Sequence, residues 1–314
     1  MTDHYVRDDV RGFLAFLNGL DGPDMRDMPL AEARGAYTAM VPVAEAANRD
    51  LAVVRDLTCP GPAGDIPLRL YDARATRDPG PAIVFYHGGG FVIGDLDTHH
   101  ALCTEIAAEM DLPVIAVHYR LAPEHAFPAA PDDCEAATRW VAGDPTELGF
   151  QVTGLIPIGD SAGGNLAIVT AQALKREPAA APVIMQVPIY PATSEDGGAS
   201  MDHFAEGFLL TRSTMDWFMN SYAGEPGHHR AYPILGDLAG TPPTVLVTAG
   251  LDPLRDQGRA YGAALIEAGV EVAYLEMRGS IHGFTTIRKA VPSAHADLLS
   301  IFAAMRLMLT RVSA

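Results

Sequence analysis

Ser161 lies in the segment GDSAG (residues 159–163), which fits the pattern G-x-S-x-G. The apolar run LIPI comes directly before this segment, and the helix-forming stretch NLAIVTAQALKR follows it. A serine nucleophile needs a sharp strand-to-helix turn so that its hydroxyl stands clear of the sheet, and flanking glycines let neighbouring backbone approach without a Cβ clash. A glycine-rich turn without chemistry is the alternative, but the strand and the helix around the motif favour a nucleophile.

A serine hydroxyl is a poor nucleophile until a base takes its proton and a third group orients that base. Asp252 closely follows the apolar run TVLVTAG, and His282 follows EVAYLEM by a short loop. Both positions are ends of late strands, in the chain order serine, acid, histidine. Asp256 and His295 fit less well, because both belong to predicted helices. The sequence therefore predicts Ser161, Asp252 and His282 as nucleophile, orienting acid and general base.

A glycine-rich loop, HGGGF (residues 87–91), follows the apolar run AIVFY. Successive glycines expose backbone N–H groups with no side chains in the way, as an oxyanion hole requires. A flexible loop and a phosphate cradle are the alternatives. However, no Gly-Lys-Ser/Thr is present, and no G-x-G-x-x-G opens a helix after this strand. Gly88, Gly89 and Gly90 are the predicted donors, and His87 is interpreted as a residue that orders the loop.

The elements that position these residues are predicted from the alternation of apolar runs and helical stretches. From Pro81 onward strands and helices alternate, which predicts an α/β fold with a mostly parallel sheet covered on both faces. Leu51–Thr58 and Ile66–Tyr71 read as two strands joined by the turn-rich CPGPAGD. Pro191–Thr241 shows no strand and is interpreted as a helical insertion.

Four segments follow from this organisation. Residues 1–50 read as helices that form a cap together with residues 191–241, over the carboxyl ends of the strands. Residues 51–190 and 242–314 are predicted to be the two parts of the catalytic domain.

Composition excludes several classes of function. The chain has 22 Lys and Arg against 39 Asp and Glu, a net charge of −17, which repels nucleic acids and anionic membranes. Three cysteines without metal-ligand spacing make a disulfide framework improbable. No H-E-x-x-H is present, so we expect no metal site. No apolar stretch approaches a membrane span and no signal peptide is evident, so we expect a cytoplasmic protein.

Taken together, the motifs resemble those of the bacterial hormone-sensitive-lipase-like esterases, family IV of the lipolytic enzymes. HGGGFVIGDLDTHHALC, YRLAPEHAFPAAPDDCEAATRW, GDSAGGNLA, LDPLRDQG and IHGF stand in that family's order, and the resemblance runs from Val53 to the C-terminus. It implies a capped α/β-hydrolase fold and the same triad. It also places Ala162 in the oxyanion hole, with Gly89 and either Gly88 or Gly90. The family implies short- to medium-chain esters as substrates, no cofactor, and often a dimer through the last strand.

Two other functions remain open at this point. An amidase or formamidase shares every motif and differs in its pocket. A ligand-binding receptor of the same fold, like the plant gibberellin receptors, lacks the catalytic histidine, whereas His282 is present here.

The residues that bind substrate and the surface that forms a dimer are less constrained. Aromatic and apolar residues near the strand ends and in the insertion are candidates to line an apolar pocket, with core packing as their alternative role: Tyr190, Phe208, Leu209, Leu210, Trp217, Tyr222 and Phe284. The final strand, Glu271–Met277, should lie at a sheet edge with little to block pairing, which predicts a homodimer. A monomer whose edge is covered by the terminal helix is the alternative.

Overall fold

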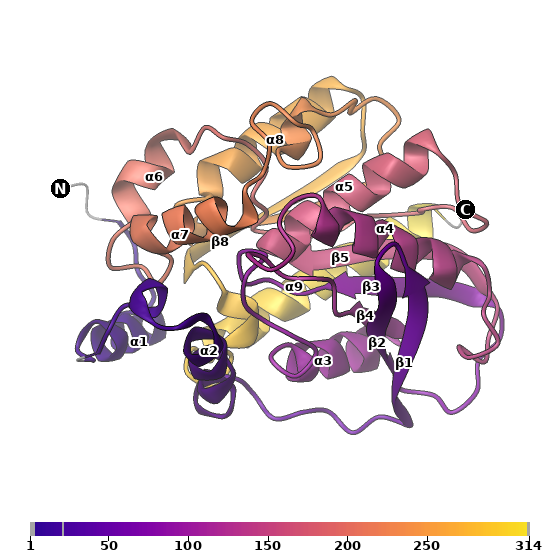
Figure 1. Cartoon of the computed structure of the whole chain (residues 1–314), viewed down its shortest axis with the longest axis horizontal. Helices are drawn as coiled ribbons and strands as arrows, with labels where there is room; N and C mark the ends of the chain where they lie inside the picture. Colours follow the sequence, from indigo (N-terminus) through magenta and orange to yellow (C-terminus); the bar gives the residue numbers. More distant parts are fainter. Residues whose placement is uncertain (1–3, 21, 313–314) are drawn as a thin grey trace.

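A single eight-stranded sheet forms the centre of the computed structural model, which describes residues 4–20 and 22–312 (Figure 1). The strands lie in the order β1-β2-β4-β3-β5-β6-β7-β8. Their bounds are β1 (Val53–Gly61), β2 (Gly64–Asp72), β3 (Gly80–Tyr86), β4 (Val114–Val117), β5 (Val152–Asp160), β6 (Val187–Ile189), β7 (Thr244–Leu251) and β8 (Val272–Ile281). β2 pairs antiparallel with β1 and β4, and every pair from β4 to β8 is parallel. The predicted α/β fold with a mostly parallel sheet is confirmed.

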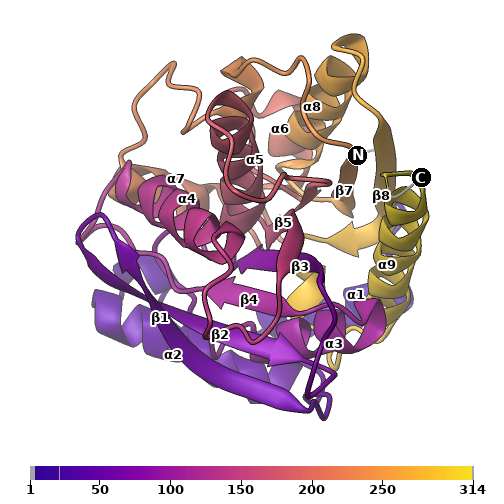
Figure 2. The same cartoon turned by 90° about the vertical axis from the view of Figure 1, so that its right-hand side faces the viewer.

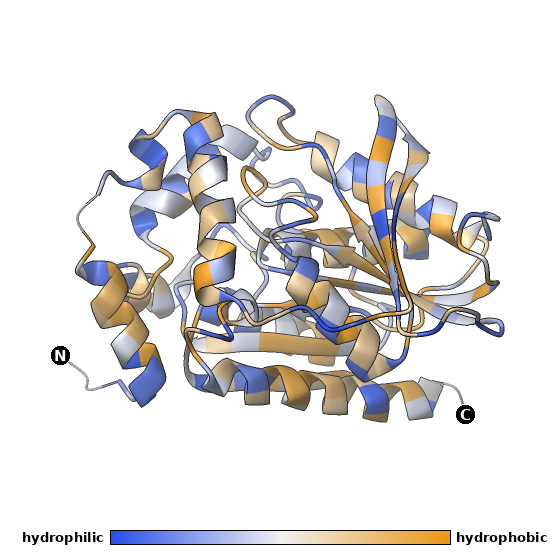
Figure 3. Cartoon of the chain, turned by 90° about the horizontal axis from the view of Figure 1, so that it is seen from below, coloured by the Kyte–Doolittle hydropathy of each residue, from blue (hydrophilic) through white to orange (hydrophobic). Residues whose placement is uncertain are grey.

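Helices cover both faces of the sheet (Figure 2). Side chains alternate along β3, so that Ile83 and Phe85 pack into one core while Val84 and Tyr86 pack into the other. The first core includes residues of α3 and α9, and the second includes residues of α4 and α5. The helices of the two layers are α3 (His100–Met110), α4 (Ala129–Ala142), α5 (Ala162–Arg176), α8 (Arg255–Glu267) and α9 (Ser293–Val312). Figure 3 shows the apolar residues concentrated along the strands between these layers.

The two segments predicted to form a cap lie side by side in the structure (Figure 1). Their helices are α1 (Asp8–Asn18), η1 (Met25–Asp27), α2 (Leu30–Ala44), α6 (Gly198–Phe204), α7 (Arg212–Tyr222) and η2 (Pro233–Leu235). The Asn18 amide donates to the Gly207 carbonyl oxygen, and the Ser213 hydroxyl bonds to Asp24. The N-terminal helices and the insertion are therefore joined directly to each other.

Buried and half-buried polar contacts fix the N-terminal helices to the rest of the molecule. Arg7 forms a bidentate ion pair with Asp297 of α9. At the end of α2, Glu45 pairs with Arg288 at 2.7 Å, and both side chains are almost fully buried. Arg288 lies six residues after His282, so this pair ties α2 to the segment that carries the predicted base.

The hairpin of β1 and β2 departs from the prediction. The sequence predicts a turn over CPGPAGD, but both strands continue into it, and Gly61 pairs with Gly64 across a two-residue connection. Gly64 has φ +135°, which glycine adopts readily and which permits the tight connection. Cys59 and Ile66 face each other in the ladder and are both buried, so their burial extends the strands beyond the turn signal.

Candidate active site

Ser161 occupies a strained turn between β5 and α5. Its φ is +56° and its ψ −116°, a conformation that non-glycine residues rarely adopt. A Cβ on Gly159 would overlap the carbonyl oxygen of Gly163, and a Cβ on Gly163 would overlap that of Tyr86. Both flanking positions therefore require glycine, which explains the pattern found in the sequence. The turn lifts the serine side chain out of the sheet, at the N-terminus of α5.

The structure brings the three predicted side chains together. The Oγ of Ser161 lies 2.9 Å from Nε2 of His282, and Nδ1 of His282 lies 2.7 Å from Oδ2 of Asp252. An ionised carboxylate only accepts hydrogen bonds, so Nδ1 carries the ring proton and Nε2 is left to accept from the serine hydroxyl. Asp252 is fully buried, and its other oxygen accepts from the Leu254 N–H at 2.8 Å.

This meeting follows from the topology of the sheet. Ser161 follows β5, Asp252 follows β7 and His282 follows β8. Because β5, β6, β7 and β8 pair in parallel, their carboxyl ends lie at the same edge. Residues that are far apart in the sequence are thus delivered to one place.

The glycine loop presents two unbonded amides next to this arrangement. Gly89 has φ +113° and Gly90 has φ +60°. Among the described residues, neither amide has a hydrogen-bond acceptor, and Ala162 begins α5, where amides have no acceptor within the helix. The Gly88 amide differs, because it donates to Oδ1 of Asp160 at 2.9 Å. The Gly88 amide is therefore already bonded within the described part of the chain, whereas the amides of Gly89 and Gly90 are not.

A buried polar cluster lies behind the loop. His99 Nε2 lies 3.2 Å from Oδ1 of Asp160, and both side chains are almost completely buried. Burial by itself raises the pKa of Asp160, but the charge and hydrogen bond of His99 and the Gly88 amide outweigh it and lower that pKa. Asp160 thus stays ionised and holds the Gly88 amide. The sequence analysis did not identify His99 or Asp160 as partners.

His87 orders the loop, as interpreted from the sequence. Its Nδ1 donates to the Gly88 carbonyl oxygen at 2.7 Å, and its ring stacks on Tyr119 at 4.3 Å. The Tyr119 hydroxyl donates to the His87 carbonyl oxygen at 2.7 Å. Burial, together with the nearby His99, lowers the pKa of His87 to about 3, so the ring is neutral.

The predicted pocket residues fall into two groups. Tyr190, Phe284 and Tyr222 are fully buried, and Leu210 is nearly so. The Tyr190 ring packs on His282 at 4.7 Å and on Phe284 at 5.2 Å. Tyr190 and Phe284 therefore pack together beside the imidazole ring of His282.

The second group is partly exposed. Leu209, Phe208 and Trp217 all lie in the insertion, and Leu209 is 39% exposed. The sequence analysis missed Phe218, which lies directly on Gly90. Phe218 and Tyr222 are four residues apart and so share one face of α7, the signal that could have identified it.

No group of three or more His, Cys, Asp or Glu in residues 4–20 and 22–312 could hold a metal ion. Within the same residues no helix is long and apolar enough to cross a membrane.

The chain is similar in sequence to known hydrolases. Residues 83–286 match the family described as alpha/beta hydrolase fold. The carboxylic ester hydrolase LipN of Mycobacterium tuberculosis is 38% identical over 269 residues, which cover 82% of this chain and 71% of LipN. The ethyl acetate hydrolase of Pseudomonas putida is 37% identical over 250 residues, covering 77% of this chain and 78% of that enzyme.

Solved structures are similar over nearly the whole chain. An ester hydrolase from the metagenome of Lake Arreo, complexed with a derivative of bipyridine phosphonate, is 36% identical with a TM-score of 0.91, and the match covers 98% of this chain and all of that one. The hyperthermophilic esterase of Pyrobaculum calidifontis is 34% identical with a TM-score of 0.89, covering 97% and 99% of the two chains. The chain therefore belongs to the α/β hydrolases, in the hormone-sensitive-lipase-like group of ester hydrolases that its motifs resemble.

Proposed function

We propose that this carboxylesterase hydrolyses esters of short- to medium-chain acids through an acyl-enzyme on Ser161. One observation carries the proposal: a continuous hydrogen-bonded chain runs from Asp252 through His282 to Ser161, and the residue before Ser161 binds the glycine loop, in which the amides of Gly89 and Gly90 are unbonded. The ethyl acetate hydrolase among the relatives is named for a short ester, which supports the substrate range.

In the first half-reaction the Ser161 hydroxyl attacks the ester carbonyl carbon. Its proton passes to Nε2 of His282, and the buried Asp252 carboxylate stabilises the imidazolium that forms. The carbonyl oxygen becomes an oxyanion held by the amides of Gly89, Gly90 and Ala162. His282 then gives its proton to the departing alcohol oxygen, which leaves the acyl group on the serine.

The second half-reaction repeats these steps with water. His282 takes a proton from the water as its oxygen attacks the acyl carbon. The same amides hold the second oxyanion, and His282 returns the proton to the Ser161 oxygen as the acid departs. The cycle consumes one ester and one water and needs no metal or cofactor.

We further propose that the partly exposed residues of the second group, Phe208, Leu209 and Trp217, face the substrate. The buried residues of the first group serve packing instead: Tyr190 packs on His282 and Phe284, and Tyr222 packs on Phe91 of the glycine loop.

One assay separates the proposed function from its alternatives. We would measure kcat/KM for p-nitrophenyl esters from acetate to decanoate and for the matching p-nitroanilides, with Ser161→Ala as the blank. An esterase cleaves the short and medium esters and leaves the anilides nearly untouched. Faster cleavage of the anilides would establish an amidase.

Covalent labelling adds a readout that does not depend on turnover. Phosphonate esters react with activated serines, so a p-nitrophenyl phosphonate should add one phosphonyl group to Ser161, located by peptide mass spectrometry. An enzyme that neither cleaves esters nor takes the label would be a receptor.

A further inference from the structure

Phe218 of α7 packs directly on the oxyanion loop. A Cβ built on Gly90 would overlap the Phe218 ring at three ring atoms, so the ring covers the face of the glycine that a side chain would otherwise occupy. One helical turn further on, Tyr222 stacks on Phe91 with ring centroids 3.8 Å apart. The Tyr222 carbonyl oxygen also accepts from the Phe127 N–H at 2.9 Å. α7 is thus seated on the loop along one face, and the Phe218 ring is held in place.

A second residue of the insertion reaches the other side of the site. A Cβ built on Gly283 would lie 3.6 Å from Cδ2 of Leu209, which is ordinary van der Waals distance. Gly283 directly follows His282, so Leu209 lies against the loop that carries the base. Leu209 has φ +74°, and the bond from Asn18 to Gly207 fixes the chain two residues before it.

We propose that Phe218 and Leu209 determine specificity for opposite ends of the ester, Phe218 for the acyl group and Leu209 for the alcohol. The assignment rests on the proposed function.

The direction of each contact follows from the mechanism. The alcohol oxygen must lie beside Nε2 of His282 to receive its proton, so the alcohol passes the base loop that Leu209 covers. The carbonyl oxygen must face the amides of Gly89 and Gly90. The remaining substituent, the acyl chain, is then directed along the oxyanion loop away from His282, beneath Phe218.

The exposure of the two side chains fits this role. Tyr222, on the same face of α7, is 1% exposed and serves packing, whereas Leu209 is 39% exposed and Phe218 is half-buried. Each residue therefore has one side packed on the catalytic loops and another side left uncovered by protein.

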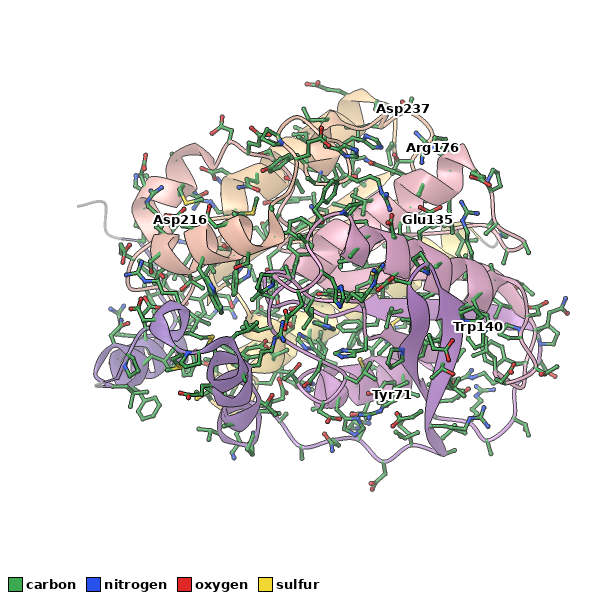
Figure 4. The ribbon with its side chains drawn as sticks, viewed as in Figure 1. Tyr71, Glu135, Trp140, Arg176, Asp216 and Asp237 are labelled. Atoms are coloured by element: carbon green, nitrogen blue, oxygen red, sulfur yellow. The ribbon has the colours of Figure 1, made fainter. Side chains whose placement is uncertain are left out.

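The test uses two substrate series on the full-length enzyme. The first keeps p-nitrophenol as the alcohol and varies the acid from acetate to octanoate. The second keeps acetate and varies the alcohol from methyl to benzyl, with release of acid followed by pH-stat titration. The variants are Phe218→Ala, Phe218→Leu and Leu209→Ala. The control is Asp216→Ala, an exposed residue of α7 (Figure 4) that lies two positions before Phe218 and so on roughly the opposite face of the helix.

We expect Phe218→Ala to raise the octanoate-to-acetate ratio of kcat/KM by about tenfold or more, since one methylene in an apolar pocket is worth roughly 10-fold or more. Its benzyl-to-methyl ratio should stay within about twofold of native. Leu209→Ala should raise the benzyl-to-methyl ratio of kcat/KM and leave the octanoate-to-acetate ratio within about twofold of native. Asp216→Ala should change neither ratio. Phe218→Leu should give an intermediate shift and guards against misfolding of the alanine variant.

Three results would overturn the proposal. Equal effects on both series would show that the cap acts as a whole, and exchanged effects would show that the substrate lies the other way round. A fall in kcat with both ratios unchanged would assign Phe218 and Leu209 a packing role. Absence of ester hydrolysis by the native enzyme, or of phosphonate labelling at Ser161, would instead reject the proposed function and this assignment with it.

Discussion

At the scale of single residues, the site depends on positions where the backbone allows only one kind of side chain. Ser161 is strained, and Gly159 and Gly163 have no space for a Cβ. The strain persists because the surrounding strand and helix determine it, and it places the serine oxygen where the base can reach it.

Ser161→Ala should abolish esterase activity and leave the fold intact. Alanine removes the nucleophile but keeps the Cβ, so the turn keeps its packing. We expect a residual rate of no more than about 10³–10⁴ over the uncatalysed reaction. Steady-state kinetics on p-nitrophenyl butyrate together with circular dichroism measure both parts. Near-native turnover in this variant would exclude the mechanism.

Asp160→Asn should lower kcat more than it raises KM. The Asp160 carboxylate holds the Gly88 amide and His99, and a neutral amide weakens both bonds, so the neighbouring donors Gly89 and Gly90 lose their alignment. Deleting an oxyanion donor costs about 10²–10³ in kcat, and misplacing donors should cost roughly 10-fold or more. Asp237→Asn, an exposed aspartate paired with Lys175 (Figure 4), is the matched control. An unchanged kcat would show that the glycine loop keeps its conformation without the Asp160 carboxylate.

His87 should make the native enzyme less stable in mild acid. Its folded pKa of about 3 lies below the unfolded value near 6.5, so between these values the unfolded chain binds an extra proton and stability rises with pH. Proton uptake by His87 in the unfolded chain should lower the free energy of unfolding by about 2–3 kcal/mol between pH 6.5 and 4.5. Urea unfolding across that range should show a shallower loss of stability in His87→Gln than in the native enzyme. If the free energy of unfolding fell equally with pH in both proteins, the lowered pKa of His87 would be contradicted.

A functional residue could be predicted from the sequence where its position at the end of a strand marks it, and not where its role depends on contacts with distant parts of the chain. Ser161, Asp252 and His282 were predicted correctly as neighbours, because each follows a strand and parallel strands end together. Phe218 and His99 act through contacts across the fold, which a local pattern does not reveal.

At the scale of elements, boundaries depend on pairing as well as on local propensity. The β1–β2 hairpin extends through the predicted turn because ladder pairing and the burial of Cys59 and Ile66 outweigh the turn signals. The insertion contains the helices α6 and α7, which both lie within residues 191–241. That these helices and residues 1–50 act as a cap over the site remains a proposal.

Glu45→Gln should destabilise the junction between α2 and the base loop. It leaves the buried Arg288 guanidinium without its closest carboxylate, although Glu105 lies 3.4 Å away and offsets part of the loss. Breaking a buried pair on one side costs about 3–5 kcal/mol, so we expect roughly 3 kcal/mol in the unfolding free energy. Urea titration measures this cost. The double variant Glu45→Gln with Arg288→Met should recover part of it, and no recovery would show that the ion pair is not the cause.

At the scale of the whole molecule, β8 lies at one edge of the sheet, as the sequence predicts. The acidic residues of the edge segment 271–277 are neutralised within the chain, because Arg259 binds Glu276 and Arg311 binds Glu271. Tyr274 on this strand is 38% exposed, and the edge carries no proline between residues 271 and 277. These features leave the edge open to pairing with another strand.

We therefore propose a two-fold dimer through residues 271–277, and we expect it to tighten with salt. Each chain carries a net charge of −17, so two copies repel each other at low ionic strength, and salt screens that repulsion. Light scattering at micromolar concentration should give twice the mass of 33.4 kDa, with a larger dimer fraction at 0.5 M than at 0.02 M NaCl.

Proline substitutions test whether this strand is the interface. Backbone N–H groups point alternately inward and outward along a strand, so one of Ala273→Pro and Tyr274→Pro removes an outward donor and should weaken the dimer. A native monomer, or a dimer that both substitutions leave unweakened while circular dichroism shows them folded, would place the interface elsewhere or nowhere.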